Sequence, residues 1–325
     1  MRDAWPKFEA EGVRLFAISY DDQTVLREFA EKQEIPFPLL SDVDSQVIRD
    51  YGILNEQIRP GDMILYGIPY PGAFVLGPDG RVAAKFFHDS YKKRDSPELF
   101  LDAARGNIQV DEDAPMAHGG EEEGVELEVA LHGGGGTFRQ GIRREILVRF
   151  RLSEGLHVYG APVPAGMVPV SIDIEGPEGL VIEPEIRQPT MPLLVEATGT
   201  ELPVWSGEVD FRIPVYPVGA LASEVRPLDQ DSARVRVRVR YQACDERVCL
   251  LPRDETFELE IPLDVVEVPA LSMHLGHGQR EGKFKAMPHA LRLMRRKILP
   301  HPIGALRFFL RNIRLELAAR RRRRS

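Results

Sequence analysis

Residues 234–241 read RVRVRVRY, a strict alternation of arginine and valine that ends at Tyr241. Side chains of a β-strand alternate between its two faces, so we expect the valines on one face and the arginines on the other. The same period of two recurs at 125–129, 145–150, 209–213 and 257–261. Short alternating strands separated by Pro and Gly turns predict an antiparallel β-sandwich from residue 125 to residue 268.

The arginine face of this strand has two interpretations. In the first, the arginines form the solvated face of the strand. In the second, they pair with the acidic residues of 107–124, although exposed ion pairs contribute little stability. The four glycines at 133–136 predict a loop, because no Lys-Ser or Lys-Thr follows them as in a phosphate-binding loop.

The first hundred residues have a different pattern, in which strands and helices alternate. The expected elements are a buried strand at 13–19, a helix around 25–35, an extended segment at 37–42, a helix at 46–51 capped by Asp44 or Ser45, a hairpin of 73–76 and 81–87, and a helix that begins at Ser96. The turn of the hairpin reads GPDG, which is typical turn chemistry. This order predicts an α/β domain over residues 1–106.

Two charged segments flank the predicted sandwich. Residues 107–124 are acidic and poor in apolar side chains, which predicts a solvated linker. From His274 to the end there are 15 Lys and Arg against 2 Asp and Glu, whereas the whole chain has 42 against 50. We therefore expect a basic helical tail over 269–325. It is either a solvated helix or a segment that contacts an anionic surface, without specific binding of nucleic acid.

Length and composition exclude several classes of protein. A chain of 325 residues exceeds one comfortable core, and 43% hydrophobic residues exclude wholesale disorder. The first residues, MRDAWPKFEAEGV, lack the apolar core of an export signal. Two cysteines cannot supply four metal thiolates, and the histidines show no metal-ligand spacing, so we expect neither a metal nor a cofactor.

The two cysteines lie close together in YQACDERVCLLP, residues 241–252. If this segment turns back on itself, the Cα atoms of Cys244 and Cys249 can approach the roughly 5.5 Å of a disulfide. So short a loop stabilises a fold little, and its polar residues are expected to keep both sulfurs near solvent, as exchange chemistry requires. The pair is thus a candidate redox switch. A small structural disulfide or two idle thiols are the alternatives.

This cysteine segment resembles the N-terminal domain of the DsbD family of thiol:disulfide interchange proteins. The likeness extends to GLHVY at 155–159 and LPVWSGE at 202–208, and it covers about 125–268. It implies an immunoglobulin-like sandwich whose cysteine pair relays electrons from a membrane partner to periplasmic acceptors. By this resemblance Cys244 and Cys249 are the redox pair and Tyr241 lies beside them. Trp205 is then a candidate residue of the loop that caps the disulfide.

The first domain is similar to the redoxin (alkyl hydroperoxide reductase/thiol-specific antioxidant) group of the thioredoxin superfamily. The matching phrases are GVRLFAISYD at 12–21, FPLLSD at 37–42 and IPYPGAFVL at 68–76. In that group a cis proline precedes the hairpin beside the active site, and Pro71 corresponds to it. The resemblance therefore implies a thioredoxin-like fold for residues 1–106.

The family's reactive cysteine has no counterpart here, because no cysteine precedes residue 244. We expect residues 1–106 to be inactive as a peroxidase or thioredoxin. The family's first strand, which would lie between 13–19 and 73–76, is also missing. The sequence thus predicts an incomplete thioredoxin-like domain with a gap or open edge in its sheet. It also predicts an N-terminus truncated by a start codon placed too late.

The leading functional hypothesis is thiol–disulfide exchange at Cys244 and Cys249 with a thioredoxin-like or membrane thiol–disulfide reductase partner. One alternative is a non-catalytic binding or scaffold protein with a structural disulfide and a degenerate redoxin domain. Another is a truncated, peroxiredoxin-like antioxidant protein. An extracytoplasmic (periplasmic) location is expected if the true N-terminus lies upstream, and a cytoplasmic one otherwise. The order in which the cysteines attack is left open.

Overall fold

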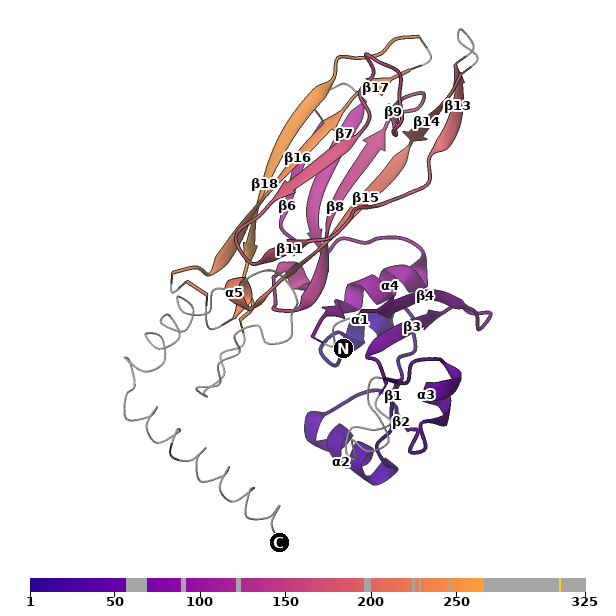
Figure 1. Cartoon of the computed structure of the whole chain (residues 1–325), viewed down its shortest axis with the longest axis vertical. Coiled ribbons are helices and arrows are strands. Elements are labelled where there is room, and N and C mark those ends of the chain that lie inside the picture. The colour runs from indigo at the N-terminus through magenta and orange to yellow at the C-terminus, as the bar shows by residue number, and fades with distance from the viewer. Residues whose placement is uncertain are drawn as a thin grey trace. The chain divides into compact units, whose positions relative to one another are not determined.

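The computed structural model describes residues 1–56, 69–88, 92–120, 124–195, 200–223, 226–227, 229–245, 247–265 and 310. They divide into two compact units, Met1–Gln109 and Val110–Ser325, whose elements are labelled in Figure 1. The predicted basic tail, 269–325, lies outside the described residues except for Leu310. Within the described part of the chain, no helix is both long and apolar enough to cross a membrane.

The first unit alternates strands and helices as its sequence predicts. Its elements are α1 (Trp5–Ala10), β1 (Ala17–Ser19), α2 (Gln23–Gln33), β2 (Leu39–Ser41), α3 (Gln46–Asp50), β3 (Gly72–Leu76), β4 (Val82–Phe87), β5 (Arg94–Asp95) and α4 (Pro97–Arg105). β1 and β2 pair in parallel, with Ala17 opposite Leu39, and α2 connects them. β3 and β4 form the predicted antiparallel hairpin, with Gly72 opposite Phe87.

The strand expected at 13–19 is shorter and less buried than its sequence predicts. β1 starts only at Ala17, while Phe16 is 52% and Ile18 38% exposed. The β1–β2 pair and the β3–β4 pair are separate two-stranded sheets. The open edges expected from the sequence are therefore present, and a strand beside such an edge has fewer neighbours to cover its apolar side chains.

Aspartates begin two helices of this unit. The Asp22 carboxylate accepts hydrogen bonds from the backbone N–H groups of Thr24 and Val25 at 2.8 and 3.0 Å, which caps α2. For α3 the predicted cap Ser45 occupies the N-cap position, but its side chain donates or accepts no capping hydrogen bond. Asp42, which follows β2 directly, instead accepts three backbone N–H groups, from Gln46, Val47 and Ile48. Capping from so far upstream requires a turn in the chain that local sequence does not reveal.

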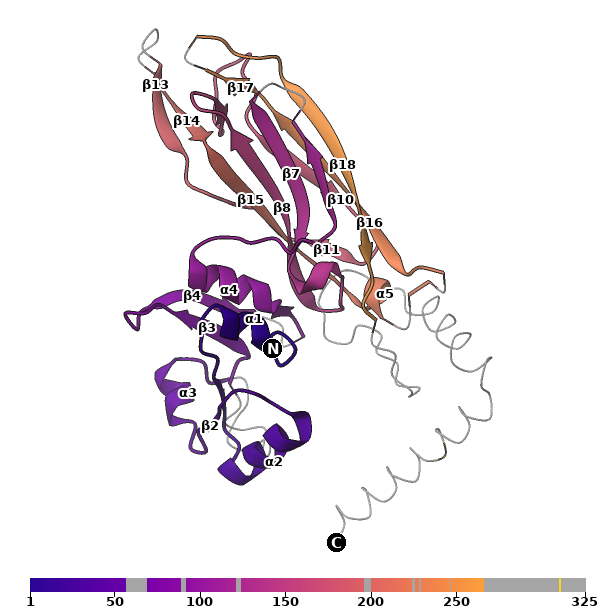
Figure 2. The same ribbon diagram turned by 180° about the vertical axis from the view of Figure 1, so that it is seen from behind.

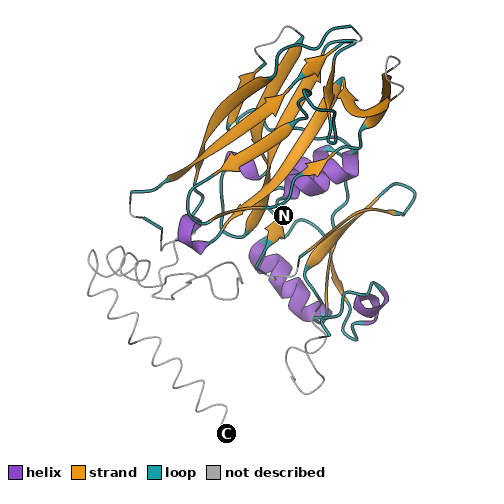
Figure 3. Cartoon of the chain, turned by 45° about the horizontal axis from the view of Figure 1, so that its top comes forward, coloured by secondary structure: helices purple, strands orange, loops and turns teal. Residues whose placement is uncertain are grey.

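The second unit is built almost entirely of strands (Figure 3). Its elements are β6 (Met116–Gly119), β7 (Val125–His132), η1 (Gly134–Gly136), β8 (Ile142–Leu152), β9 (His157–Tyr159), β10 (Ser171–Glu175), β11 (Leu180–Ile182), β12 (Ile186–Arg187), β13 (Met191–Val195), β14 (Thr200–Ser206), β15 (Glu208–Pro217), α5 (Gly219–Ala222), β16 (Ser232–Tyr241), β17 (Ala243–Cys244) and β18 (Arg253–Pro262). Within this unit the strand orders are β11-β15-β8-β7-β6, β10-β16-β18 and β13-β14-β9-β17. β9, β17 and the β13–β14 hairpin lie at the end of the domain away from α5 (Figures 1 and 2).

One apolar core lies between the sheets of the second unit. It contains Val148 and Phe150 of β8, Phe211 of β15 and the inward-facing valines of β16. The Phe150 ring packs edge-on against Phe211 and Tyr241, with centroids 5.6 and 5.3 Å away. Side chains from both sheets thus meet in the middle, which confirms the predicted mostly-β domain.

The Val–Arg alternation of 234–241 is confirmed residue by residue. Val235, Val237 and Val239 are fully buried, while every arginine from 234 to 240 is exposed. Arg236 pairs with Glu258 of β18 at 3.0 Å and with Glu175 of β10 at 3.4 Å. The arginine face is therefore exposed, and its ion pairs are with acidic residues of the neighbouring strands. These ion pairs differ from the alternative interpretation, in which the arginines pair with residues 107–124.

Part of the predicted linker, 107–124, belongs to the sandwich. Met116–Gly119 forms β6 and pairs with β7, so that Ala117 lies opposite Val129. A Cβ on Gly119 would come within 2.6 Å of the Phe257 ring, so only glycine permits this close approach. The sequence signal failed here because β6 has four residues, none of them β-branched.

Candidate functional site

The two cysteines form a disulfide that closes a tight turn at the end of the second unit. Cys244 and Cys249 are bonded, with their Cα atoms 4.1 Å apart. Backbone hydrogen bonds from Asp245 N to Val248 O and from Leu250 N to Ala243 O, at 3.0 and 2.9 Å, fold the segment back on itself. The predicted approach of the two cysteines is therefore present.

Side-chain oxygens fix the shape of this turn. The Asp245 carboxylate accepts the backbone N–H groups of Arg247 and Val248, both at 2.6 Å. These two hydrogen bonds hold the pKa of Asp245 below its usual range, because they stabilise the charged carboxylate. At the base of the turn, the buried Gln242 amide donates to Leu250 O and accepts from Val168 N, each at 3.0 Å. Gln242 thereby closes the base of the turn and anchors it to the segment of Val168.

The two sulfur-bearing residues differ sharply in exposure. Cys244 is fully buried in a small apolar cluster with Tyr159, Leu202 and Val204. Cys249 is exposed. The expectation that both sulfurs lie near solvent is thus correct for Cys249 and wrong for Cys244, since β17 continues into the sheet beside β9 and takes Cys244 with it.

Two polar side chains of β9 lie close to Cys249 Sγ. The Tyr159 hydroxyl is 3.7 Å from Cys249 Sγ, and its other neighbour is His157 Nε2 at 3.1 Å. Both residues are buried, at 4% and 7% exposure. Burial lowers the pKa of His157, an effect that the nearby Asp245 carboxylate partly opposes, and burial raises the pKa of Tyr159. The arrangement links the sulfur to a titratable imidazole.

From the sequence, Tyr159 appears only within the phrase GLHVY, and His157 is interpreted as a solvated or core histidine because it lacks metal-ligand spacing. Their spacing of two residues places them on the same face of a strand, which was a usable signal. Which face meets the cysteines depends on the pairing of β9 with β17, where His157 lies opposite Cys244. That pairing joins segments far apart in the sequence, so the local pattern does not reveal it.

The structure places Tyr241 and Trp205 in the sandwich core, and their expected roles beside the disulfide stay predictions. Tyr241 is fully buried and its hydroxyl donates to Glu255 Oε1 at 2.7 Å. Trp205 is 4% exposed, packs edge-on against Phe211 and donates its indole N–H to Gln188 O at 3.0 Å. Strand alternation explains the burial of Tyr241, whereas β14 buries both of its faces near Trp205, with Val204 in the small cluster and Trp205 in the main core.

Pro71 belongs to the first unit, directly before β3. The cis peptide bond of the described residues is Ala161–Pro162, so the Tyr70–Pro71 bond is trans and the expected cis proline is absent. The trans isomer is the ordinary state of such a bond.

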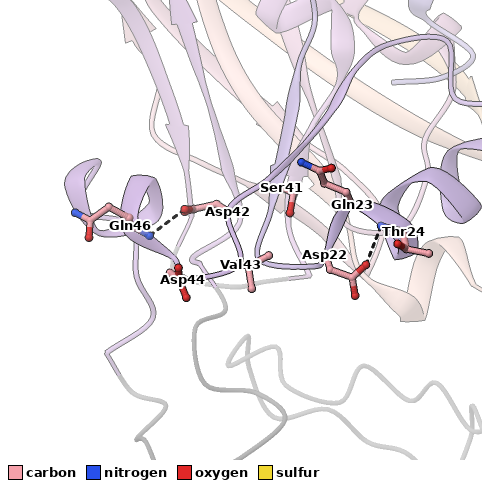
Figure 4. A pocket seen from close by; sticks show the side chains of 8 residues that line it. All are labelled: Asp22, Gln23, Thr24, Ser41, Asp42, Val43, Asp44 and Gln46. Atoms are coloured by element: carbon pink, nitrogen blue, oxygen red, sulfur yellow. Dashed lines mark hydrogen bonds between the residues drawn. The ribbon is translucent and has the colours of Figure 1, made fainter.

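Figure 4 shows a surface pocket of the first unit. It is lined by Asp22, Gln23, Thr24, Ser41, Asp42, Val43, Asp44 and Gln46. Asp22 and Asp42 there accept the backbone N–H groups that begin α2 and α3, so their carboxylates already serve the fold. In the part of the chain that the structure describes, no three His, Cys, Asp or Glu side chains are grouped to hold a metal ion. The disulfide end of the second unit is therefore the candidate site.

In a comparison with known protein families, a different family model matches part of each unit. Residues 1–85 match the AhpC/TSA family, and residues 137–261 match the N-terminal region of thiol:disulfide interchange protein DsbD. Among curated proteins, chloroplastic peroxiredoxin Q of Arabidopsis thaliana is 33% identical over 102 residues, which are 31% of this chain and 41% of that protein. Peroxiredoxin Bcp of Escherichia coli is 31% identical over 101 residues, 31% of this chain and 62% of its own. The chain thus covers only part of these relatives.

Comparison with solved structures gives further matches to this chain, all with low TM-scores. The N-terminal periplasmic domain of ScsB from Proteus mirabilis has a TM-score of 0.31 and 16% identity, with 45% of this chain and 51% of that chain covered. The reduced DsbD N-terminal domain of Neisseria meningitidis has a TM-score of 0.25 and 21% identity, with 36% and 77% covered. A complex of the DsbD and PilB N-terminal domains from the same organism has a TM-score of 0.24 and 18% identity. The match covers 36% of this chain and 80% of that chain. From the family matches, this chain carries an AhpC/TSA redoxin domain at residues 1–85 and a DsbD N-terminal domain at residues 137–261.

Proposed function

We propose that the protein exchanges thiols and disulfides with a protein partner through Cys244 and Cys249. The observation that supports this best is the asymmetry of the disulfide, in which Cys249 is exposed at a turn and Cys244 is buried. An attacking thiolate needs access to one sulfur and a second sulfur that can leave. The redoxin domain takes no part in this step, because no cysteine precedes residue 244.

In the proposed reaction a thiolate of the partner attacks Cys249 Sγ. A new S–S bond forms between the partner and Cys249, the bond between Cys249 and Cys244 breaks, and Cys244 leaves as a thiolate that then takes a proton. The partner's second thiolate attacks its own sulfur in the mixed disulfide and releases Cys249 as a thiolate, which is also protonated. Two electrons pass from the partner's dithiol to this protein, and the reverse sequence passes them to an acceptor.

The surface around Cys249 suits a protein partner. Val248 and Leu251 flank the cysteine and are 57% and 78% exposed, so an apolar contact is available beside the reactive sulfur. The DsbD N-terminal domain of Neisseria meningitidis forms a complex with the PilB N-terminal domain. By analogy we propose a thioredoxin-like or membrane thiol–disulfide reductase partner.

A structural disulfide in a non-catalytic binding module is the second candidate. The burial of Cys244 in an apolar cluster favours it, because such surroundings protect a bond from exchange. The turn is short, however, and chain entropy gives a bond across it little stabilising effect. The two candidates predict different reduction potentials.

The test is equilibration of the full chain in thiol redox buffers, followed by alkylation and mass analysis. Exchange predicts a potential between about −120 and −270 mV, as in oxidoreductases, whereas a value below about −300 mV indicates a structural bond. A Cys244→Ser variant whose Cys249 is first converted to a mixed disulfide with thionitrobenzoate should also react with a reduced thioredoxin-like protein that lacks its resolving cysteine. The partner thiolate attacks Cys249 Sγ, thionitrobenzoate leaves as its thiolate, and the adduct stays trapped on Cys249. A structural potential together with failure to trap refutes the proposal.

A further inference from the structure

Three side chains form a continuous line from the surface into the domain. Cys249 Sγ is 3.7 Å from the Tyr159 hydroxyl, which is 3.1 Å from His157 Nε2. Tyr159 and His157 are two residues apart on β9, and their rings meet edge to face with centroids 5.1 Å apart. Cys249 is an exposed residue, while Tyr159 and His157 are buried. A proton that moves along this line would be held away from bulk water.

We propose that His157, acting through the Tyr159 hydroxyl, takes the proton of the Cys249 thiol in the reduced protein and so prepares the attacking thiolate. This inference rests on the proposed exchange function and deepens it. It makes Tyr159 the bridge that contacts the reacting sulfur and His157 the proton acceptor. The buried Cys244 sulfur is not part of the line.

The proton balance is simple. In the starting state the Cys249 S–H donates to the Tyr159 oxygen, and the Tyr159 O–H donates to the unprotonated Nε2 of His157. In the final state His157 Nε2–H donates to the Tyr159 oxygen, and the Tyr159 O–H donates to the Cys249 thiolate. One proton has moved from sulfur to imidazole, both hydrogen bonds are kept with reversed polarity, and no electrons have moved.

The charges around His157 fit an acceptor that is neutral at rest. Its burial disfavours the imidazolium, so its pKa is lowered, while the Asp245 carboxylate favours the imidazolium once the proton arrives. Burial raises the pKa of Tyr159, so the hydroxyl stays protonated and relays the proton rather than losing it. The paired strands β14 and β17 place Ser206 and the disulfide-bonded Cys244 opposite His157.

Disulfide exchange needs such an arrangement because the nucleophile is the thiolate, while a free cysteine with a pKa near 8.5 is mostly protonated at neutral pH. The described contacts of Cys249 include a hydroxyl donor that can stabilise a negative sulfur. A hydrogen bond to the charged form lowers the pKa of the group that receives it. The positive charge of the His157 imidazolium, next to the Tyr159 hydroxyl, also stabilises the thiolate and so lowers the pKa of the Cys249 thiol.

The experiment measures the rate of iodoacetamide alkylation of Cys249 against pH in the full chain carrying Cys244→Ala, which leaves one thiol. His157→Gln should raise the pKa of the thiol and slow alkylation at neutral pH by roughly tenfold, the change produced by one pKa unit, with no change at pH 10. His118→Gln is the matched control, because His118 is exposed on β6, and its pH profile should be that of the parent.

Tyr159→Phe guards against a folding failure of the histidine variant, because it removes only the bridging hydroxyl and keeps the ring. It should slow alkylation as His157→Gln does, and the double variant should be no slower than either single one. Equal pH profiles for the parent and both single variants would overturn the relay. If the relay is measured but Cys249 forms no mixed disulfide with any thioredoxin-like protein at any pH, the proposed function fails instead.

Discussion

The β16–β18 strand pair and the turn at β9 and β17 belong to one domain but bury different kinds of side chain. Between β16 and β18 the inward side chains are mainly apolar, and the two buried polar ones, Tyr241 and Glu255, hydrogen-bond to each other. At the turn, His157, Tyr159 and Gln242 are buried although each carries polar atoms. Buried polar groups stabilise a fold less than apolar ones, so their presence at the turn is better explained by chemistry than by packing.

This contrast predicts a separation of effects. Substitutions in the strand pair and its core should change the free energy of unfolding and leave exchange intact. Substitutions at the turn should change exchange and leave the core folded. Trp205 reports on the second unit because it is buried in the core, and a Trp5→Phe background removes the other tryptophan from the fluorescence signal.

The largest expected effect is at Cys249. Cys249→Ser should abolish mixed-disulfide formation with a thioredoxin-like protein, because no other sulfur of the chain is both exposed and able to accept the attack. The measurement is trapping followed by mass analysis. Val248→Ala, in the same turn, is the control and should still form the adduct. Undiminished trapping by the serine variant would show that the reactive group lies elsewhere.

The next effect concerns the core. Phe150→Ala should lower the free energy of unfolding of the second unit by about 3–5 kcal/mol, since it removes a fully buried ring that packs against Phe211 and Tyr241. Denaturant titration followed by Trp205 fluorescence measures it, and the folded fraction should exchange at the parent rate. Phe16→Ala is the matched control in the first unit. At 52% exposure its effect should stay within about 0.5 kcal/mol.

Phe16 also shows how far the sequence alone could be read. Apolar runs predicted strands in both units, and the alternation at 234–241 gave the correct buried face for every residue. An apolar pattern shows which side of a strand is suited to burial, but it does not show which other elements pack against that side. The exposure of β1 therefore could not be derived. The same limit hid the neighbours of the disulfide, because the pairing of β9 with β17 joins residues 157 and 244. The family resemblance implied that Tyr241 lies beside the cysteines, and its strand directs its ring into the core.

A third prediction uses pH to separate the two regions. Burial lowers the pKa of His157 in the folded protein, so the unfolded chain binds more protons below its ordinary pKa of about 6.5. The second unit should therefore keep its full stability above that pH and lose some of it as the pH falls toward the folded pKa. His157→Gln should flatten this part of the stability curve, whereas His118→Gln should not. Denaturant midpoints by Trp205 fluorescence from pH 7.5 to pH 5 provide the measurement.

The smallest effect is expected on the charged face of β16. Arg236→Ala removes ion pairs with Glu258 and Glu175, but all three side chains are about half exposed or more, and water and salt screen such pairs. At low ionic strength the variant should unfold at a slightly lower denaturant concentration than the parent, and the difference should vanish near 1 M salt. Exchange through Cys249 should be unchanged. A large loss that persists at high salt would mean that the arginine stems cover the valine core, in which case this face contributes to stability through packing rather than through charge.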